Sequence, residues 1–455
     1  MKHTTIRSAV LTAACCAAIG ACHDATPTDA LSLIGTPQAS LVTNITVSDL
    51  GFEVTLVPFF GGLGINANGD VAAALLDAQF RSRAVLRAAD GNLIDLGTLG
   101  GSQAAANDVN DLGQVVGWSY TSDNPVSHAF RWTVGTGMQD LGTLPGGHFS
   151  YASAINNLGQ VVGFSDGPGN DHAFLWTAER GMQDLGTLGG PFSEALDIND
   201  LGQVVGSSTL SNSTTRAFLW TPSTGMHDLG GLVSAGYSEA LGLNNLGHVV
   251  GRAGTQTADH AFLWRPESGM VDLGPSSGCS SDADAFAIND FDQVVGRLTI
   301  VSKVLAACEA FVWTAEGGMV DLGGLGGSFP EARTINNVGQ VVGASDNPTN
   351  TQFRATLWTV QFTPPTPVEQ ILRVETELQN AVSVGALSDG QADGLRAKLE
   401  AATQQFNKDN LGSAINLIQA FIRQVQSYTN AGIVSAPAGQ SLIDAAQSAI
   451  NELMS

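Results

Sequence analysis

The chain has 455 residues and a formal net charge of −23, from 42 acidic and 19 basic side chains. This length exceeds what one simple hydrophobic core fills, so several domains or one large repeat fold are expected. A chain this acidic offers no positive surface for a phosphate backbone, which excludes nucleic acid as a partner.

The N terminus indicates export. MKHTTIR is a short basic region, and AVLTAACCAAIGA is an apolar stretch too short to remain as a membrane-spanning helix. It leads into IGAC, which ends at Cys22 and resembles the lipobox of bacterial lipoproteins. The resemblance implies a signal peptide over residues 1–21, lipidation of Cys22, and membrane contact through that lipid only. With His23 rather than Asp after the cysteine, it implies an outer-membrane lipoprotein that faces the periplasm or the cell surface. The alternative is an ordinary secretory signal cut near Ala21 or Ala25.

After a small, polar tether over residues 22–43, one unit repeats along the chain. The first anchor of the repeat is an asparagine after an aliphatic residue, at positions 66, 110, 156, 199, 244, 289 and 336. The second is Asp-Leu-Gly, with its Asp at positions 49, 95, 140, 184, 228, 272 and 321. The third is an A-F-L-W stretch that ends in Trp at positions 132, 176, 220, 264, 313 and 358, and in Arg87 in the remaining copy.

Inside one unit the local signals are those of strands. Around Asn199, SEALDIN and QVVG flank Asn-Asp-Leu-Gly, a pattern typical of a type I turn followed by a left-handed glycine. RAFLWT is apolar on both alternating faces, which predicts a strand covered on each side. Gly225 then marks a turn into MHDLG. Each unit of about 45 residues therefore predicts a four-stranded antiparallel meander, the size of a propeller blade.

Seven such units bury both faces of every A-F-L-W strand only when they pack side by side in a ring. The sequence therefore predicts an all-β, seven-bladed β-propeller of four-stranded antiparallel blades over residues 44–361. The first Asp-Leu-Gly precedes any A-F-L-W partner, and the last A-F-L-W has no Asp-Leu-Gly after it. The N-terminal strand would thus complete the last blade and lock the ring. Two alternatives stay open: blades that begin with Asp-Leu-Gly and lack the lock, and an open β-solenoid.

The repeated H-A-F, G-M-x-D-L-G and I-N-x-x-G-Q-V-V-G motifs together resemble the HAF family of bacterial extracellular repeats. The resemblance covers some 320 residues and implies export and a repeat architecture, without established catalytic residues. The sequence departs from the histidine of the motif at four positions, Arg83, Arg216, Glu309 and Arg354. A shared histidine-based function is therefore doubtful.

Repetition also argues against catalysis by the repeated residues. The Asp of Asp-Leu-Gly occurs in every unit, which favours a hydrogen-bonding role in a turn, and His128, His172 and His260 are expected to be structural for the same reason. DVNDLG and DINDLG superficially resemble calcium loops, but other copies lack the first ligand and none ends in a bidentate Glu. No nucleophile elbow, phosphate loop or zinc spacing is present, so no cofactor, no metal and no enzymatic activity are expected.

Binding is expected on one rim of the ring. The connections after QVVG and after Asp-Leu-Gly share that rim and differ between copies, for example WSYTSDNPVS, FSDGPGND and RAGTQTAD. We call it the divergent rim, because variable loops on a rigid scaffold are the usual place for a ligand. The candidate binding residues there are Trp118, Tyr120, Phe149, Tyr151, Tyr237, Asp282, Asp284 and Lys303. Cys279 and Cys308, in the longer loops of the sixth unit, predict a disulfide in an oxidising compartment.

After TPPTP, a proline-rich linker over residues 362–368, the period of apolar residues becomes helical. A small bundle of three or four amphipathic helices is expected over residues 369–455, with a capping box at Ser388 and Gln391. AFIRQVQSYTNAGIVSAPAGQSLIDAAQSAI resembles the FIMAH type of helical module found at the C termini of secreted bacterial proteins. We interpret it as a spacer or as a module that docks a partner.

The sequence therefore predicts an exported, lipid-anchored, non-catalytic binding or scaffold protein that takes a protein or glycan ligand on its divergent rim. The alternative is a propeller enzyme, a lyase or a glycosidase, that acts on a cell-envelope or extracellular polysaccharide.

Overall fold

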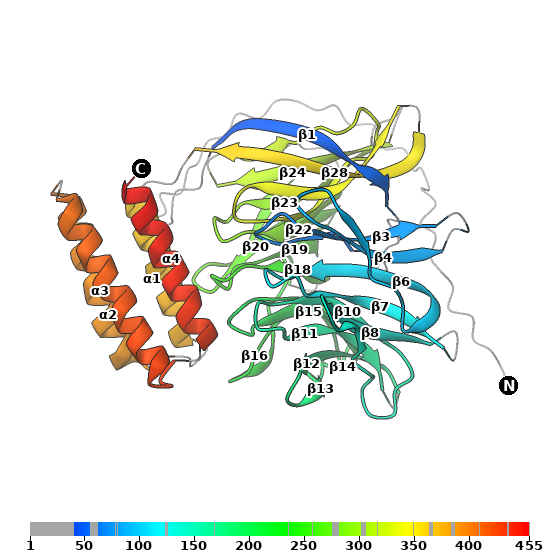
Figure 1. Ribbon diagram of the computed structural model, residues 1–455, viewed down its shortest axis with the longest axis horizontal. Coiled ribbons are helices and arrows are strands. Elements are labelled where there is room, and N and C mark those ends of the chain that lie inside the picture. The colour runs from blue at the N-terminus through cyan, green and yellow to red at the C-terminus, as the bar shows by residue number, and fades with distance from the viewer. Residues whose placement is uncertain are drawn as a thin grey trace.

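A computed structural model shows seven four-stranded antiparallel sheets arranged around a channel, followed by four helices (Figure 1). This confirms the predicted seven-bladed β-propeller and the C-terminal helices. The structure describes residues 41–54, 62–77, 79, 81–122, 126–167, 169–234, 236–256, 258–274, 282–301, 306–315, 317–348, 350–363, 367–383, 387–408, 410–434 and 436–454. The predicted lipid anchor Cys22, most of the tether, Cys279 and Lys303 lie outside the described residues.

The blades follow one another along the chain, each as a meander of neighbouring strands. In blades 1 to 3 the strands are β2 (Gly64–Ile65), β3 (Val71–Leu76), β4 (Ser82–Arg87), β5 (Leu93–Asp95), β6 (Gly100–Val109), β7 (Val115–Thr121), β8 (Ser127–Thr133), β9 (Gly137–Asp140), β10 (Ser150–Ile155), β11 (Val161–Asp166), β12 (Asp171–Thr177) and β13 (Gly181–Asp184). In blades 4 to 6 they are β14 (Gly189–Ile198), β15 (Val204–Leu210), β16 (Thr215–Thr221), β17 (Gly225–Asp228), β18 (Ser238–Leu243), β19 (Val249–Gly254), β20 (Asp259–Arg265), β21 (Gly269–Gly274), β22 (Asp282–Ile288), β23 (Val294–Val301), β24 (Ala306–Thr314) and β25 (Gly318–Asp321). Blade 7 consists of β26 (Glu331–Ile335), β27 (Gln340–Asn347), β28 (Asn350–Phe362) and β1 (Val42–Glu53).

The N-terminal strand closes the ring. β1 pairs antiparallel with β28 at the far end of the propeller chain, for example Ile45 opposite Val360 and Val47 opposite Trp358. This confirms that the N-terminal strand completes the last blade. It also rules out the two alternatives, because an open solenoid and blades that begin with Asp-Leu-Gly both lack this pairing.

Each blade is held on its neighbours by the A-F-L-W strand. In β16, Ala217 packs in a cluster with Phe262 of blade 5, and the adjacent Phe218 packs in a cluster with Ala195 and residues of blade 3. Both residues are fully buried. Burial of such a phenylalanine contributes about 2 kcal/mol, and the same contact recurs around the ring. The sheets therefore lose stability if any one of them is removed from the ring.

The repeated asparagine forms both the turn and the ring. In blade 4, Asn199 Oδ1 accepts the backbone N–H groups of Leu201 and Gln203 at 3.1 and 3.0 Å, and Gly202 closes the turn with a φ of +72°. The Nδ2 of each such asparagine donates to the carbonyl oxygen of its equivalent in the next blade. The last of these bonds, from Asn336 Nδ2 to Asn66 O at 3.1 Å, closes the circle. We call the rim that carries these turns the Asn rim.

The Asp-Leu-Gly carboxylates are structural, as the sequence predicts. In all seven copies the Asp accepts the backbone N–H of the glycine two residues later, at 2.7 to 2.9 Å. Some of these carboxylates also pair with the second residue of the third strand, for example Asp140 with His128 at 2.9 Å and Asp95 with Arg83 at 2.7 Å. Arginine thus takes the place of the motif histidine as the partner of this carboxylate. Glu309 differs, and burial together with the nearby Asp321 raises its pKa.

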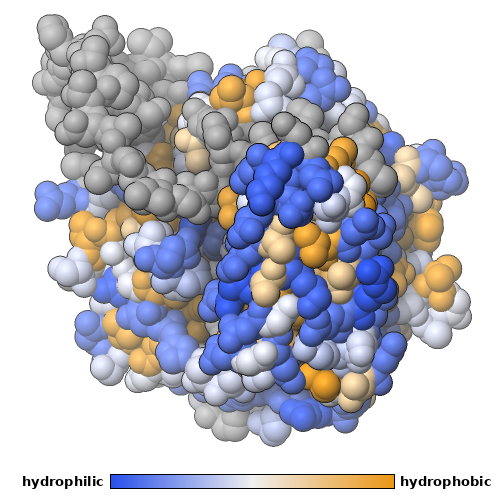
Figure 2. Space-filling model, turned by 90° about the vertical axis from the view of Figure 1, so that its left-hand side faces the viewer, coloured by the Kyte–Doolittle hydropathy of each residue, from blue (hydrophilic) through white to orange (hydrophobic). Residues whose placement is uncertain are grey.

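The C-terminal helices form a separate core. They are α1 (Pro367–Ser383), α2 (Asp389–Phe406), α3 (Leu411–Asn430) and α4 (Ala436–Met454). Leu378, Leu395, Phe421 and Leu442 are among the buried residues where the helices meet. The predicted capping box is present before α2, where the backbone N–H of Ser388 donates to the Gln391 side chain at 2.8 Å. Seen from the helical side, much of the surface is hydrophilic, with scattered apolar patches (Figure 2).

This helical module packs on the Asn rim of blades 4 to 6 (Figure 1). Arg373 of α1 donates to the carbonyl oxygen of Asp290, and its guanidinium lies 3.6 Å from the ring centroid of Phe291. The leucines at equivalent turn positions show by their exposure which blades the module covers. Leu246 in blade 5 is 2% exposed, whereas Leu112 in blade 2 is 68% exposed. One half of the rim is therefore covered by the module and the other half is not.

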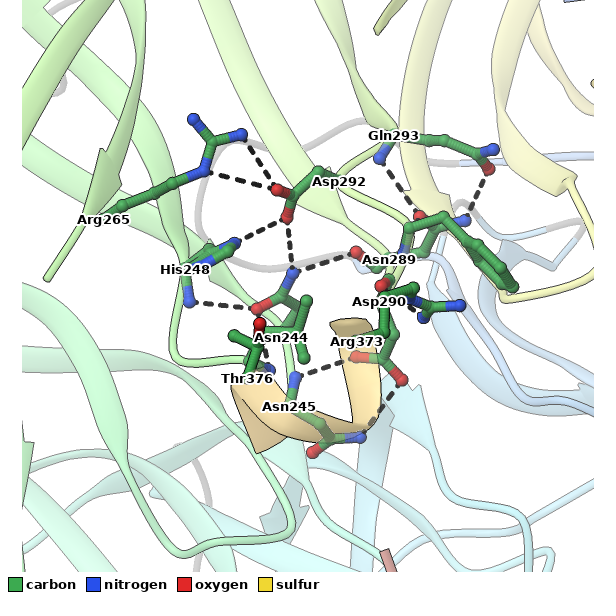
Figure 3. A network of polar contacts seen from close by, with 12 residues as sticks. Asn244, Asn245, His248, Arg265, Asn289, Asp290, Asp292, Gln293, Arg373 and Thr376 are labelled. Carbon is green, nitrogen blue, oxygen red and sulfur yellow. Dashed lines mark hydrogen bonds and ion pairs between the residues drawn. The ribbon is translucent and has the colours of Figure 1, made fainter. Parts of the chain in front are cut away.

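A buried polar network under the module joins blades 5 and 6 (Figure 3). Asp292 stands at the turn position where other copies have glycine, with a φ of +55°. Its carboxylate accepts Asn244 Nδ2 at 3.0 Å and Arg265 Nη2 at 2.9 Å, and lies 2.7 Å from His248 Nδ1. Burial opposes the charge of Asp292, but His248 and Arg265 hold its pKa well below the usual range.

Candidate binding site on the divergent rim

One layer of the propeller breaks the sevenfold repeat. It lies five residues before each ring asparagine, near the divergent-rim end of the inner strand of each blade. In blades 2 to 7 the residues are Ala105, Tyr151, Glu194, Glu239, Asp284 and Glu331. They lie opposite Trp118, Phe164, Ser207, Arg252, Arg297 and Ala344 on the second strands. The next residue of the inner strand is alanine in each of these copies, so the varied position lies beside a constant one.

Blades 2 and 3 supply an aromatic half of the layer. The ring centroid of Trp118 lies 5.4 Å from that of Tyr120 and 5.8 Å from that of Tyr151. Tyr151 continues the cluster to Phe149 at 5.8 Å and stacks on Phe164 at 5.1 Å. The structure thus brings together four predicted residues, Trp118, Tyr120, Phe149 and Tyr151. Trp118 is only 6% exposed and packs against Ala74 and Ala105, so it supports the cluster from beneath.

Blades 5 to 7 supply a charged half in which acids and arginines alternate. Arg252 pairs with Glu239 at 2.7 Å and reaches Asp284 of the next blade at 3.5 Å. Arg297 pairs with Asp284 at 2.6 Å and reaches the next blade's Glu331 at 3.3 Å. Each of these carboxylates therefore touches at least one guanidinium, and the ion pairs tie neighbouring blades together.

Glu194 of blade 4 is the exception in this series of carboxylates. Its Oε1 accepts the Ser207 hydroxyl at 3.2 Å. No ion pair joins Glu194 to a described arginine, lysine or histidine. Burial, and next the charge of Glu239, raise the pKa of Glu194 to about 7. The carboxyl therefore changes its charge near neutral pH.

A cavity of about 310 Å³ opens where the aromatic and charged halves meet. It is lined by Phe164, Asp171, Phe192, Ser193, Glu194, Ser207, Ser208, Thr209, Thr215 and Glu239. Burial, and then Asp166, raise the pKa of Asp171. Phe192 is 47% exposed at this site. The lining thus combines two aromatic rings with eight polar side chains, so the cavity suits a polar ligand with a ring.

The other predicted site residues lie elsewhere. Tyr237 is in blade 5 beside Arg252, 5.7 Å from the guanidinium carbon to the ring centroid, and burial raises its pKa. Asp282 accepts the backbone N–H of Asp259 at 3.0 Å. Asp284 is buried in the charged half. The predicted disulfide joins Cys279 and Cys308. Cys308 forms no disulfide with a described residue, and Cys279 lies outside the described residues. The disulfide therefore stays a prediction.

Sequence reasoning missed the residues that form the cavity. Glu194, Glu239, Phe164 and Phe192 lie on strands, whereas the variable loops are where the sequence predicts a ligand. Alignment of the copies on their asparagine would have found the first two, because the residues at position −5 change from aromatic to acidic around the ring.

A second cavity, of about 210 Å³, lies at the channel mouth on the Asn rim. Its polar groups make hydrogen bonds that hold the propeller together. Asp108 accepts backbone N–H groups from Val109 and Ile155, and burial raises its pKa to about 7. Asp197 accepts the backbone N–H groups of Ile198 and Leu243 in the same way. The hairpin interpretation of DVNDLG and DINDLG is therefore supported. In the described part of the chain, no His, Cys, Asp and Glu side chains gather in a group of three or more that would hold a metal.

Comparison with known proteins identifies the helical part. Residues 373–451 match the FIMAH domain family. No curated protein matches the chain. No helix among the described residues has the length and apolar character needed to cross a membrane.

Several solved propellers are similar to the chain at low identity. The β-propeller domain of the Trilobed protease from Pyrococcus furiosus is 11% identical, with 68% of this chain and 97% of that chain covered and a TM-score of 0.46. The BP39L lectin from Burkholderia pseudomallei is 9% identical over 72% and 99% of the two chains, with a TM-score of 0.42. A puromycin-hydrolyzing peptidase from Mycobacterium tuberculosis is 12% identical over 69% and 55%, with a TM-score of 0.47. Nothing about function follows from likenesses this distant. The chain is thus a seven-bladed β-propeller followed by a C-terminal FIMAH domain.

Proposed function

We propose that this protein is a binding module that captures a glycan or protein of the cell envelope on its divergent rim, without catalysis. The observation that carries the proposal is the cavity between Phe192 and Glu194, which lies in the non-repeating layer. Variable side chains on a rigid scaffold are the usual place for recognition, and several side chains around this cavity differ from those at the same positions of other blades.

The proposal includes an exported protein of the HAF type that is held at the outer membrane by a lipid on Cys22. Its support is the IGAC motif and the three repeat motifs of the sequence. Metabolic labelling with an alkyne fatty acid tests the anchor. Label is expected on the wild-type chain and not on Cys22→Ser, and equal labelling of both would contradict the anchor.

Binding is tested by screening the purified full chain on glycan and protein arrays. We expect Tyr120→Ala and Phe192→Ala to weaken the strongest signal about tenfold, because aromatic anchors supply most of the binding energy at such sites. Val134→Ala is the control, since this residue is 83% exposed in a β8–β9 turn on the opposite rim. Trp118→Ala is a poorer test, because Trp118 is buried in the cluster. Full binding by both rim variants would contradict the proposal.

A second candidate function, a glycosidase or lyase, is favoured by one observation. Glu194, whose pKa is raised to about 7, and Glu239, which Arg252 holds at 2.7 Å, line the same cavity. A protonated carboxyl beside a carboxylate is the pair that glycoside cleavage uses. New reducing or unsaturated ends from an envelope polysaccharide, lost in Glu194→Gln, would favour this candidate over a binding module.

A further inference from the structure

We propose that the cavity beside Glu194 binds an amino sugar, with the primary ammonium group of the sugar next to the Glu194 carboxylate. This inference rests on the proposed function and adds the chemical class of the ligand. It starts from the charges of the non-repeating layer.

Over blades 4 to 7 the layer holds four carboxylates and two arginines, and Arg333 lies beside it. Arg252, Arg297 and Arg333 pair with the acids of blades 5 to 7, Arg333 at 2.6 Å from Glu331. Glu194 is left as the end of this alternating series. An organic cation in the cavity would therefore occupy the place that a guanidinium occupies beside the other three carboxylates.

The surroundings of Glu194 favour a cationic ligand. The charged groups that face it are Glu239 from β18, Arg252 from β19 and Asp171 from β12, and Ser207 of β15 is its hydrogen-bond donor. Since Arg252 is already shared between Glu239 and Asp284, the acids next to the cavity outnumber the bases. A bound ammonium group restores the balance, and a charge-assisted hydrogen bond is stronger than a neutral one.

The rest of the cavity favours a sugar ring. Its volume of about 310 Å³ lies at the lower end of the range for small-ligand sites, which fits one monosaccharide. Phe164 and Phe192 contribute aromatic rings to the lining, and the Thr215 hydroxyl adds a polar group.

The test is calorimetric titration of the full chain at about pH 6.5 with three probes: D-glucosamine, N-acetyl-D-glucosamine and Nα-acetyl-L-lysine amide. We expect D-glucosamine to bind at least tenfold more tightly than its acetylated, uncharged form. We also expect it to bind more tightly than the lysine derivative, which carries the ammonium without the ring. Binding of D-glucosamine should release protons, because the bound cation lowers the pKa of Glu194. Repeating the titration in buffers of different ionisation enthalpy measures this release.

Glu194→Gln is expected to lose about tenfold in affinity for D-glucosamine and to lose the proton release. Glu179→Gln, an exposed acid in the turn between β12 and β13, is the matched control and should behave as wild type. Equal affinity for the acetylated sugar, or no binding of D-glucosamine, would overturn the proposal. Preferential binding of the lysine derivative would overturn it in favour of a peptide ligand. The wild-type comparison stands even if a variant misfolds.

The two proposals fail separately. Envelope capture that persists while D-glucosamine is not bound would remove the amino sugar and leave the binding module. Binding of D-glucosamine without any capture on the arrays would leave the amino-sugar site and remove the capture of an envelope component.

Discussion

At the scale of single residues, the repeat shows which side chains are structural. The ring asparagines and the Asp-Leu-Gly carboxylates make the same contacts in blade after blade. Residues that leave the pattern stand out against this background, as Glu194 does in the cavity and Asp292 does in the turn of blade 6. Each departure changes the local charge, so each has a measurable consequence.

The stability of the propeller should depend on pH through Glu194. Its pKa is about 7 in the folded chain, above the ordinary value of 4.5, so the folded state holds this proton more tightly. The wild-type chain therefore loses stability as pH rises from about 5 to 8, and Glu194→Gln should lose less, because only the other raised carboxyls, such as Asp108, still titrate in the variant. Between about pH 5 and pH 8 the free energy of unfolding should shift in favour of the variant by about 2 kcal/mol. All seven tryptophans lie in the propeller, so their fluorescence in guanidinium reports this unfolding. A difference that is constant with pH would refute the assignment.

His248 and Asp292 should be energetically coupled. Asp292→Gly alone restores the repeat's glycine but leaves His248 and Arg265 buried without their carboxylate. His248→Gln together with Asp292→Gly restores the glutamine of five other blades and the glycine of all six other blades at these positions. The double variant should therefore be less destabilised than the sum of the single variants, by about 1 to 2 kcal/mol. Chemical unfolding of the four proteins measures this coupling, and strict additivity would show that the network contributes nothing beyond its separate contacts.

At the scale of elements, the strands and helices were predictable from the sequence. The contacts that each element makes with others were predictable only in part. The asparagine–glycine turns and the two-faced A-F-L-W strands fix the meander locally, and the unmatched ends of the repeat predict the β1–β28 pairing. The packing of α1 on the Asn rim was not predictable. It depends on Arg373 and Phe291, which are some 80 residues apart in sequence and carry no shared motif. The cavity was missed for a similar reason, because it joins side chains from three blades.

The contact between the helical module and the propeller should depend on Arg373. Arg373→Ala removes the bond to Asp290 O and the stacking on Phe291, while the apolar contact at Leu201 remains. We expect faster hydrogen exchange in the turns of blades 5 and 6, and no change in the uncovered turn of blade 2, measured by mass spectrometry. Arg423→Ala, on an exposed position of α3, is the control. Unchanged exchange in all turns would mean that the apolar contact alone holds the module.

At the scale of the whole molecule, the two rims have different roles. The Asn rim holds the ring together through repeated hydrogen bonds and carries the FIMAH domain on blades 4 to 6. The divergent rim carries the aromatic cluster, the alternating ion pairs and the cavity between them. A ligand taken on the divergent rim therefore approaches from the side opposite the helical module (Figure 1).

The most direct test of this division is hydrogen exchange of the full chain with and without its strongest array ligand. We predict protection in peptides that cover residues 190–194, 207–215 and 237–239, which form or border the cavity on the divergent rim. Peptides that cover the turns at residues 110–113 and 336–339, on the uncovered half of the Asn rim, should be unchanged. Protection of those turns, with the cavity peptides unchanged, would contradict the account.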